Sequence, residues 1–229
     1  IYVEADHSPY ARNRDQRIGQ NLPLHLVGSS AIIPPGGVKK SDGSPYTVYT
    51  PFSKAWKDLT AGGFGTPVQP PKHIATPNDL HSAMLPDLDT DFSQPSFLAG
   101  EKEGQNRLRN FLEGGDTATI YNYADGRNML DRQGTSRISP YLRFGMLSPR
   151  EVAYHAMEAI QYAPDPKAGE SAEIWLNEII WREFYIHILY HFPRVRKENF
   201  RLGTIGWEND PDNFAAWSHG QTGYPIVDA

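Results

Sequence analysis

The sequence predicts an α/β segment followed by an all-α domain, and three observations support this division. Residues 1–59 alternate short apolar runs with a helical stretch, which is typical of α/β structure. Residues 60–97 are rich in Pro, Gly and Asp and lack periodicity, which is typical of a linker. Residues 98–192 carry apolar positions at helical spacing together with capping residues. We therefore expect an α/β part over 1–59, a linker over 60–97, and a helical domain over 98–229.

Composition and charge bound the class of protein. The chain has no cysteine, which excludes a disulfide framework and a thiolate metal site and favours a reducing, cytoplasmic location. It has no run of about 18 apolar residues, so no membrane span is expected. The net charge of −5 gives no general reason for nucleic-acid binding, but it leaves a local basic surface open. The chain starts "IYVEAD" and stops at "GYPIVDA", which predicts an internal piece of a longer protein.

The N-terminal part is expected to contain three short strands and one helix. The runs "IYVEAD", "LHLVG" and "AIIPPG" are apolar and closed by turn residues, and "PYARNRDQRIGQNL" has the pattern of a helix with a basic face. The aromatic, β-branched stretch "PYTVYTPFSKAW" is expected to turn at Pro51. A connection as long as the segment that follows is either a functional lid or an interdomain tether, and the change of composition on both sides favours the tether.

Two helices are expected early in the helical domain. The first covers 100–112 and is stopped by Gly114–Gly115. The second begins with Ser139 as N-cap and Pro140 at the first helical position, and Gly145 ends it.

Two longer helices follow. Ser148 and Glu151 have the spacing of a capping box around Pro149, so a helix is expected to start there. The next helix is expected over about 171–192, and Pro193 ends it.

The predicted 171–192 helix combines aromatic and charged residues in an unusual way. Trp175, Glu178, Arg182 and Tyr185 share one face, and Trp181 flanks it. The other sides are apolar, so the helix is expected to be buried and its mixed face to line an internal cavity. Glu178 and Arg182 also have the i, i+4 spacing of an ordinary helix ion pair. Burying charges without a purpose costs several kcal/mol per ion, so both interpretations stay open.

A second polar group lies just before a helix N-terminus. Thr135, Ser136, Arg137 and Ser139 place three hydroxyls and a guanidinium together, an arrangement that suits a phosphate or pyrophosphate. Ordinary capping explains the same hydroxyls.

No metal site is expected. His187 and His191 lie one turn apart on one helix, but no third ligand is evident, so we interpret them as ordinary core or surface histidines.

Three signatures in register resemble the DNA photolyase/cryptochrome flavoprotein family. They are "GTSRISPYLRFGMLSPRE", "WLNEIIWREFY" and "GWENDPDNFAAWSHGQTGYPIVDA". The sequence is most like the class I cyclobutane pyrimidine dimer photolyases. The resemblance implies the tail of an N-terminal Rossmann-like antenna domain, a long linker, and the first part of an all-helical FAD-binding domain.

The resemblance also implies two chromophores. One is FAD, and the other is an antenna whose identity stays open, because "HSPYAR" lacks the Asn-Glu pair of the folate-binding members. The residues implied as FAD contacts are Tyr123, Thr135, Ser136, Arg137, Ile138, Ser139, Trp175 and Arg182.

The implied reaction is light-driven repair of damaged DNA by a monomer. Excited, fully reduced FAD donates an electron to a flipped pyrimidine dimer, the cyclobutane ring splits, and the electron returns. Glu178 and Trp181 match the residues that meet the dimer, and Trp207 matches the surface end of a tryptophan chain that re-reduces FAD. The implied DNA contacts are Arg127, Glu178, Trp181, Arg182 and Tyr185.

Two alternatives remain. The first is a cryptochrome, a light-signalling flavoprotein without repair; Glu178 with Trp181 favours the repair enzyme, because (6-4) photolyases and animal cryptochromes tend to have Gln at the Glu position. The second is a related helical domain without FAD, which the intact "TSRIS" and "WREF" stretches argue against.

Overall fold

The computed structural model describes residues 1–63, 71–75, 83–84, 97–114, 119–201 and 205–228, and these form two compact units. The first unit is Ile1–His191 and the second is Phe192–Ala229. Most of the predicted linker lies outside the described residues, so its role as a tether and the predicted domain boundaries stay predictions. Among the described residues, no helix has the length and apolar character that crossing a membrane requires.

The first unit starts with two short parallel strands, β1 (Tyr2–Glu4) and β2 (His25–Val27), in the register Tyr2 to His25. Helix α1 (Pro9–Gly19) connects them, as expected for a parallel pair, and the Ser8 hydroxyl caps its first turn. The strands predicted in "IYVEAD" and "LHLVG" and the helix between them are confirmed.

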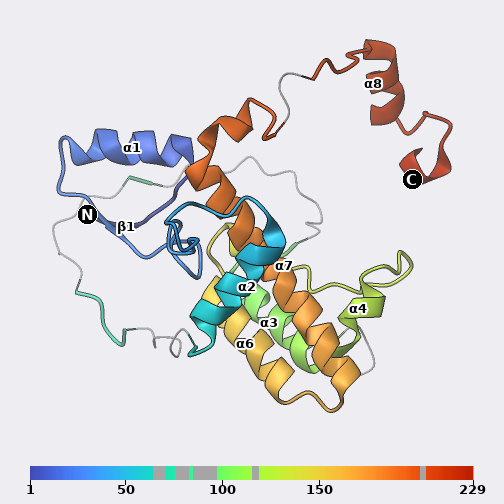
Figure 1. Cartoon of the computed structure of the whole chain (residues 1–229), viewed down its shortest axis with the longest axis horizontal. Helices are drawn as coiled ribbons and strands as arrows, with labels where there is room; N and C mark the ends of the chain where they lie inside the picture. The colour runs from blue at the N-terminus through green and yellow to red at the C-terminus, as the bar shows by residue number, and fades with distance from the viewer. Residues whose placement is uncertain (64–70, 76–82, 85–96, 115–118, 202–204, 229) are drawn as a thin grey trace. The chain divides into compact units, whose positions relative to one another are not determined.

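The remaining elements of this unit are helical (Figure 1). They are α2 (Tyr49–Thr60), α3 (Glu101–Glu113), the 3₁₀ turn η1 (Ile120–Asn122), α4 (Tyr123–Gly126), α5 (Ser139–Arg143), α6 (Pro149–Gln161) and α7 (Pro166–His191). The α/β-plus-helical fold class is confirmed.

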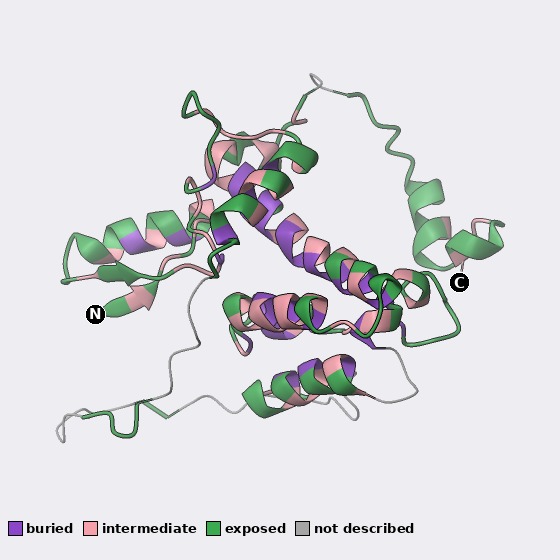
Figure 2. Ribbon diagram, turned by 60° about the horizontal axis from the view of Figure 1, so that its bottom comes forward, coloured by how far each residue is buried: buried purple, intermediate pink, exposed green. Residues whose placement is uncertain are grey.

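Helix α7 is the centre of the first unit. It packs against α6, η1, α4 and α2, and its buried positions occur on several sides along its length (Figures 1 and 2). It begins at Pro166, five residues earlier than predicted, because the Asp165 carboxylate accepts from the Ala168 N–H and Pro is tolerated in a first turn. The predicted end before Pro193 is confirmed.

Two predictions for the N-terminal part are wrong. "AIIPPG" is not a strand, because the N–H groups of Ile32 and Ile33 donate to Glu183 of α7 and the two prolines that follow have no N–H. The chain does not turn at Pro51 either, because α2 begins at Tyr49 and so places Pro51 in its first turn.

The predicted helix caps are confirmed in part. Gly114 follows the last residue of α3, and Gly145, with φ of 70°, follows the end of α5. Ser139 is the first residue of α5 rather than its N-cap, a difference of one position. Ser148 is the N-cap of α6, but its side chain makes no capping bond, so the predicted capping box does not form.

The second unit contains η2 (Pro193–Arg196), α8 (Pro211–Ser218) and α9 (Pro225–Asp228). The Asp210 carboxylate caps α8 by accepting from the N–H groups of Asp212 and Asn213. Asp228 accepts from the backbone and hydroxyl of Thr222, and these hydrogen bonds lower the pKa of the Asp228 carboxyl.

Candidate cofactor and substrate site

A cavity of about 1090 Å³ opens in the helical part of the first unit. It lies at the upper end of the size range of ligand sites in proteins, so it has room for a large organic cofactor. Its walls are α3, the η1–α4 turn and the loop that leads to α5. The lining residues are Glu103, Arg107, Asn110, Phe111, Asn122, Asp125, Gly126, Met129, Arg132, Gln133, Gly134, Thr135, Ser136 and Arg137.

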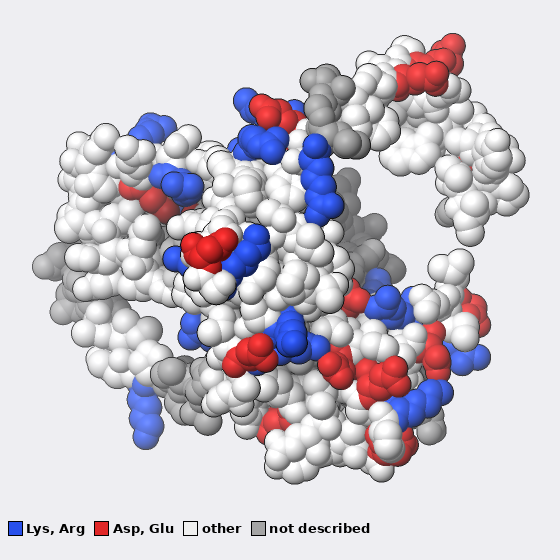
Figure 3. Space-filling model, viewed as in Figure 1, with Lys and Arg blue, Asp and Glu red and all other residues white. Residues whose placement is uncertain are grey.

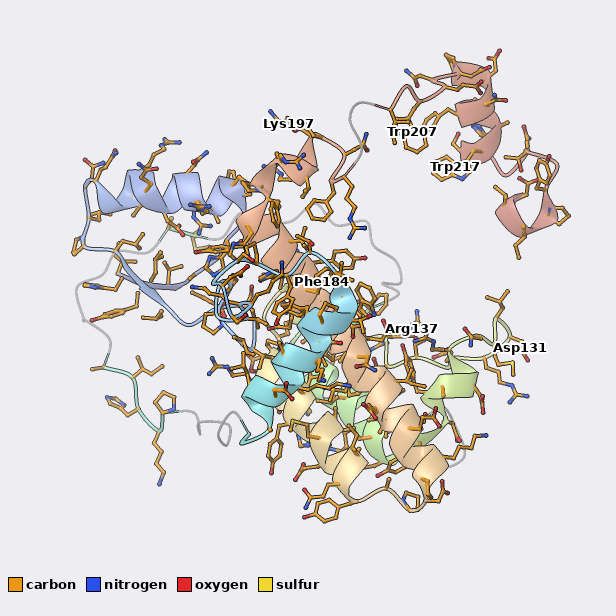
Figure 4. All side chains as sticks on the ribbon, viewed as in Figure 1. Asp131, Arg137, Phe184, Lys197, Trp207 and Trp217 are labelled. Carbon is orange, nitrogen blue, oxygen red and sulfur yellow. The ribbon has the colours of Figure 1, made fainter. Side chains whose placement is uncertain are left out.

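The predicted hydroxyl cluster forms one wall of this cavity. Thr135, Ser136 and Arg137 line it, and the Ser136 hydroxyl accepts a hydrogen bond from the Trp175 ring nitrogen at 3.4 Å. Figure 4 labels Arg137, which comes from the loop that follows α4. Ile138 is buried beneath the loop, and Ser139 is exposed at the start of α5. The cavity therefore gathers the first three members of this predicted set but not the last two.

The loop that carries these hydroxyls closes tightly on α4. A Cβ atom on Gly134 would overlap the Gly126 carbonyl group, so only glycine fits at position 134. Arg137 has φ of +52°, an unfavourable backbone conformation for a residue other than glycine. Its guanidinium lies 5.1 Å from the centre of the Phe97 ring, and that of Arg107 lies 5.0 Å from the same ring.

Two predicted aromatic contacts lie behind the cavity wall. Phe111 lines the cavity, and its ring contacts those of Trp175 and Tyr123 at centroid distances of 5.0 and 6.0 Å. Both of these rings are buried. Burial, followed by the negative charge of Glu178, raises the pKa of the Tyr123 hydroxyl.

A buried serine attaches this wall to α7. The Ser171 hydroxyl donates to the Ile120 carbonyl at 2.8 Å and accepts from the Ala124 N–H at 3.0 Å. These two hydrogen bonds join the η1–α4 turn to the helix that carries Trp175.

Farther along α7, the predicted substrate residues form a second group. Glu178 pairs with Arg127 at 2.5 Å, and the Arg127 guanidinium lies 5.6 Å from the centre of the Tyr123 ring. Trp181 stacks on Tyr49 of α2, and the Tyr185 ring also stacks with Trp181, with a ring-centroid distance of 5.6 Å and an angle of 24° between the planes. None of Glu178, Trp181 and Tyr185 lines the large cavity. On the face shown in Figure 3, acidic and basic side chains are mixed around α4 rather than forming a field of one sign.

The interpretation of Glu178 and Arg182 as an i, i+4 ion pair is wrong. Glu178 instead pairs with Arg127, while Arg182 donates to the Ser30 carbonyl at 2.7 Å and lies 3.5 Å from Glu183. Arg182 therefore contacts the segment before the linker and does not line the cavity.

The sequence interpretation missed Glu183, which is the most buried charge of α7. Its side chain is 2% exposed and accepts from the N–H groups of Ile32 at 2.8 Å and Ile33 at 3.2 Å. Burial raises the pKa of this carboxyl to about 7. Its helical neighbours Ile180 and His187 are also buried, so a helical projection of the sequence could have placed Glu183 on the buried side.

It also missed the polar face of α3. Glu103, Arg107 and Asn110 lie at i, i+4 and i+7, on one face of the helix, and all three line the cavity. Arg107 is paired with Glu103 at 2.9 Å. Their common spacing is visible in the sequence. The apolar positions of the same helix, however, were interpreted as packing positions, and its polar face was given no role.

The two histidines of α7 contact each other. His187 is buried, with its ring nitrogen 3.2 Å from the Tyr46 carbonyl, and its ring packs against that of His191. Within the part of the chain that the structure describes, no three His, Cys, Asp or Glu residues gather into a possible metal site.

The cavity suits FAD by its size and by the chemistry of its walls. Arg107, Arg132 and Arg137 can meet a pyrophosphate, the hydroxyls of Thr135 and Ser136 can donate to it, and Phe111 supplies an apolar surface.

Known proteins resemble this chain along its whole length. Residues 1–72 match the family described as DNA photolyase, and residues 175–229 match the FAD binding domain of DNA photolyase. A deoxyribodipyrimidine photo-lyase of Thermus thermophilus is 36% identical over 233 residues, and that of Escherichia coli is 33% identical over 243 residues. Each alignment covers 100% of this chain and 49% of the relative, so the chain spans about half the length of these proteins.

Solved structures agree with the sequence matches. A bacterial class III photolyase from Agrobacterium tumefaciens superposes with a TM-score of 0.81 at 27% identity, covering 100% of this chain and 48% of the other. A Synechocystis cryptochrome gives a TM-score of 0.76 at 22% identity, covering 98% and 49%, which is a likeness of fold alone.

Proposed function

We propose that this chain, which belongs to the DNA photolyase/cryptochrome family, is part of a deoxyribodipyrimidine photo-lyase that splits cyclobutane pyrimidine dimers in DNA. The observation that carries this proposal is the arrangement along α7. Trp175 bonds to the cavity loop through Ser136, and within the next two turns Glu178 contacts Arg127 and Trp181 contacts Tyr49. One rigid helix thus carries residues for a cofactor and for a base.

Cofactor binding is assigned to the cavity and the residues behind it. Arg137 and the hydroxyls of Thr135 and Ser136 would hold the phosphates of FAD, while Tyr123 and Trp175 support the wall from behind. Bound FAD, reduced and excited by light, would supply the electron that opens the dimer. The electron would return once the two carbon–carbon bonds that join the pyrimidines have broken, so the reaction would have no net oxidation. The roles of Ile138, Ser139 and Arg182 as FAD contacts stay predictions.

Substrate recognition is assigned to the second group on α7. Trp181 would stack on the flipped dimer, Glu178 would accept hydrogen bonds from its bases, and Arg127 would contact a phosphate. Glu178 and Arg127 hold each other, and both are partly exposed, so exchanging this pair for DNA contacts costs little. Arg182 and Tyr185 remain predicted DNA contacts at the edge of this group.

Electron supply is assigned to the second unit. Trp207 is 76% exposed there, as expected for the surface end of a tryptophan chain. A second antenna chromophore, a monomeric state, a cytoplasmic location and the class I subtype also belong to this proposal and rest on the family resemblance.

The deciding experiment uses the complete protein and Glu178→Gln. Light-dependent splitting of a thymine dimer in an oligonucleotide is measured with the flavin reduced beforehand. We expect wild type to split the dimer and Glu178→Gln to lower the repair yield per photon at unchanged FAD content, because a hydrogen bond to a charged group contributes about 1.5–3 kcal/mol. A wild-type protein that binds FAD but splits no dimer would reject the enzyme and support a cryptochrome. Equal repair by both proteins would remove Glu178 from substrate recognition.

A further inference from the structure

Tyr49 of α2 lies flat against the indole ring of Trp181. The two ring centroids are 3.5 Å apart and the planes differ by 4°. At this distance the rings are in van der Waals contact, so no other ring can enter between them. A base that stacks on Trp181 must therefore use the opposite face of the indole.

Two further contacts hold the stacked pair in place. The Tyr49 hydroxyl donates to the Asn177 carbonyl of α7 at 3.1 Å. The edge of Phe184 contacts both rings, with centroid distances of 5.9 Å to Tyr49 and 5.8 Å to Trp181. Burial, followed by the charge of Glu178, raises the pKa of the Tyr49 hydroxyl to about 12, so it remains a donor at neutral pH.

We propose that Tyr49 is a positioning residue for substrate binding, which supports Trp181 on one face and fixes the plane in which the opposite face meets a pyrimidine dimer. The inference rests on the proposed function, because it assigns that opposite face to a base. A ring that is already ordered loses less conformational entropy on binding than a mobile one. Tyr49 therefore acts through Trp181 and does not touch the substrate.

The position of Tyr49 in the chain adds a consequence. It belongs to the segment before the predicted linker, whereas Trp181 belongs to the helical domain after it. The stacking platform for the base is therefore built by residues from both sides of the linker.

The test compares Tyr49→Leu, Tyr49→Phe and Tyr46→Leu in the complete, FAD-loaded protein. We expect Tyr49→Leu to raise both Kd and KM for an oligonucleotide with a thymine dimer about three- to tenfold, the range that an aromatic stack contributes. The kcat at saturating substrate, the FAD content and the affinity for undamaged DNA should stay near wild type. Tyr49→Phe keeps the ring and should restore dimer binding. Tyr46→Leu is the matched control, because Tyr46 packs edge-on against Phe52.

Each outcome bears either on this inference alone or on the proposed function as well. If wild type splits dimers and Tyr49→Leu binds them equally well, the inference falls and the enzyme assignment stands. Equal losses of affinity for dimer and undamaged DNA, or a fall in FAD content, would show a general structural role and also overturn it. Tighter dimer binding by Tyr49→Leu would overturn it too, because Tyr49 would then cover the substrate face. A wild-type protein that splits no dimer would remove the proposed function and this inference together.

Discussion

Replacing Glu183 with Gln should change how the stability of the protein depends on pH. The Glu183 carboxyl is buried, and its pKa rises from the ordinary value of 4.5 to about 7. A raised pKa means that the folded state holds this proton more tightly than the unfolded state. The resulting stabilisation is fully present below pH 4.5 and is lost as the pH rises to about 7. One pKa unit corresponds to about 1.4 kcal/mol, so the loss amounts to about 3 kcal/mol.

Glu183→Gln keeps the size of the side chain and an oxygen that can accept from Ile32 and Ile33, but it cannot ionise. We expect the free energy of unfolding of the variant, minus that of wild type, to rise by about 3 kcal/mol between pH 4.5 and 8. The assay is urea unfolding of the complete protein, followed by circular dichroism at several pH values with FAD at a fixed saturating concentration. Because both proteins bind the same ligand, its contribution cancels in the difference.

His187, one helical turn away, provides an internal check of opposite sign. Burial, with a smaller effect of His191, lowers the pKa of its imidazole from 6.5 to about 4. Its contribution to stability is present above pH 6.5 and is lost as the pH falls to about 4. Between pH 4.5 and 6.5 the contributions of Glu183 and His187 therefore cancel in wild type. In Glu183→Gln the free energy of unfolding should therefore rise with pH over this range, because only the contribution of His187 remains. In His187→Gln it should fall with pH, because only the contribution of Glu183 remains. If the free energy of unfolding of Glu183→Gln, minus that of wild type, stays constant or falls as the pH rises, this reasoning is refuted.

Three other perturbations address the site and the electron supply. Arg127→Ala should weaken damaged-DNA binding and lower its salt slope by about one, as measured by titration at several salt concentrations; an unchanged slope would place Arg127 outside the interface. Trp207→Phe should slow photoreduction of oxidised FAD in the complete protein, while repair by chemically reduced enzyme stays near wild type; equal photoreduction would reject the role of Trp207. Gly134→Ala should destabilise the cavity loop by about 1–3 kcal/mol and reduce FAD retention, because the added Cβ meets the Gly126 carbonyl, and full retention would contradict this. Gly19→Ala, where the added Cβ meets nothing within 4 Å, is the matched control.

Local signals in the sequence were enough to predict most of the helices. Pro149 and Pro193 at the helix boundaries, and Gly114 and Gly145 after the helix ends, act through the backbone of their own segment. The stretch "AIIPPG" shows where this reasoning fails. It has the composition of a strand, but its backbone bonds to Glu183, more than 140 residues later in the chain. No local pattern reveals such a partner.

In the candidate site, too, features that lie within one motif could be predicted from the sequence, and contacts between distant segments could not. The Thr135–Ser136–Arg137 cluster and the aromatic content of α7 could be predicted, because each lies within one motif. The pairing of Glu178 with Arg127 and the stack of Trp181 on Tyr49 could not, because their partners lie 51 and 132 residues away. The i, i+4 spacing offered Arg182 as one possible partner of Glu178, because this rule considers one helix alone. In the structure Glu178 pairs with Arg127 of another segment instead.

The contacts of α7 limit how this protein can be recombined with its relatives. The helix has 26 residues and is about 39 Å long, and it bonds to the cavity loop near Trp175 and to the N-terminal segment near Glu183. A hybrid that takes residues 1–59 from a relative would also exchange Tyr49, which stacks on Trp181. It would exchange the Ser30 carbonyl, which accepts a hydrogen bond from Arg182, and the Ile32 N–H, which donates one to Glu183. Within residues 1–59, a crossover before Ser29 would replace the strand pair and α1 and would keep these supports native. A junction that keeps these contacts therefore lies before Ser29, ahead of the segment predicted to be the linker.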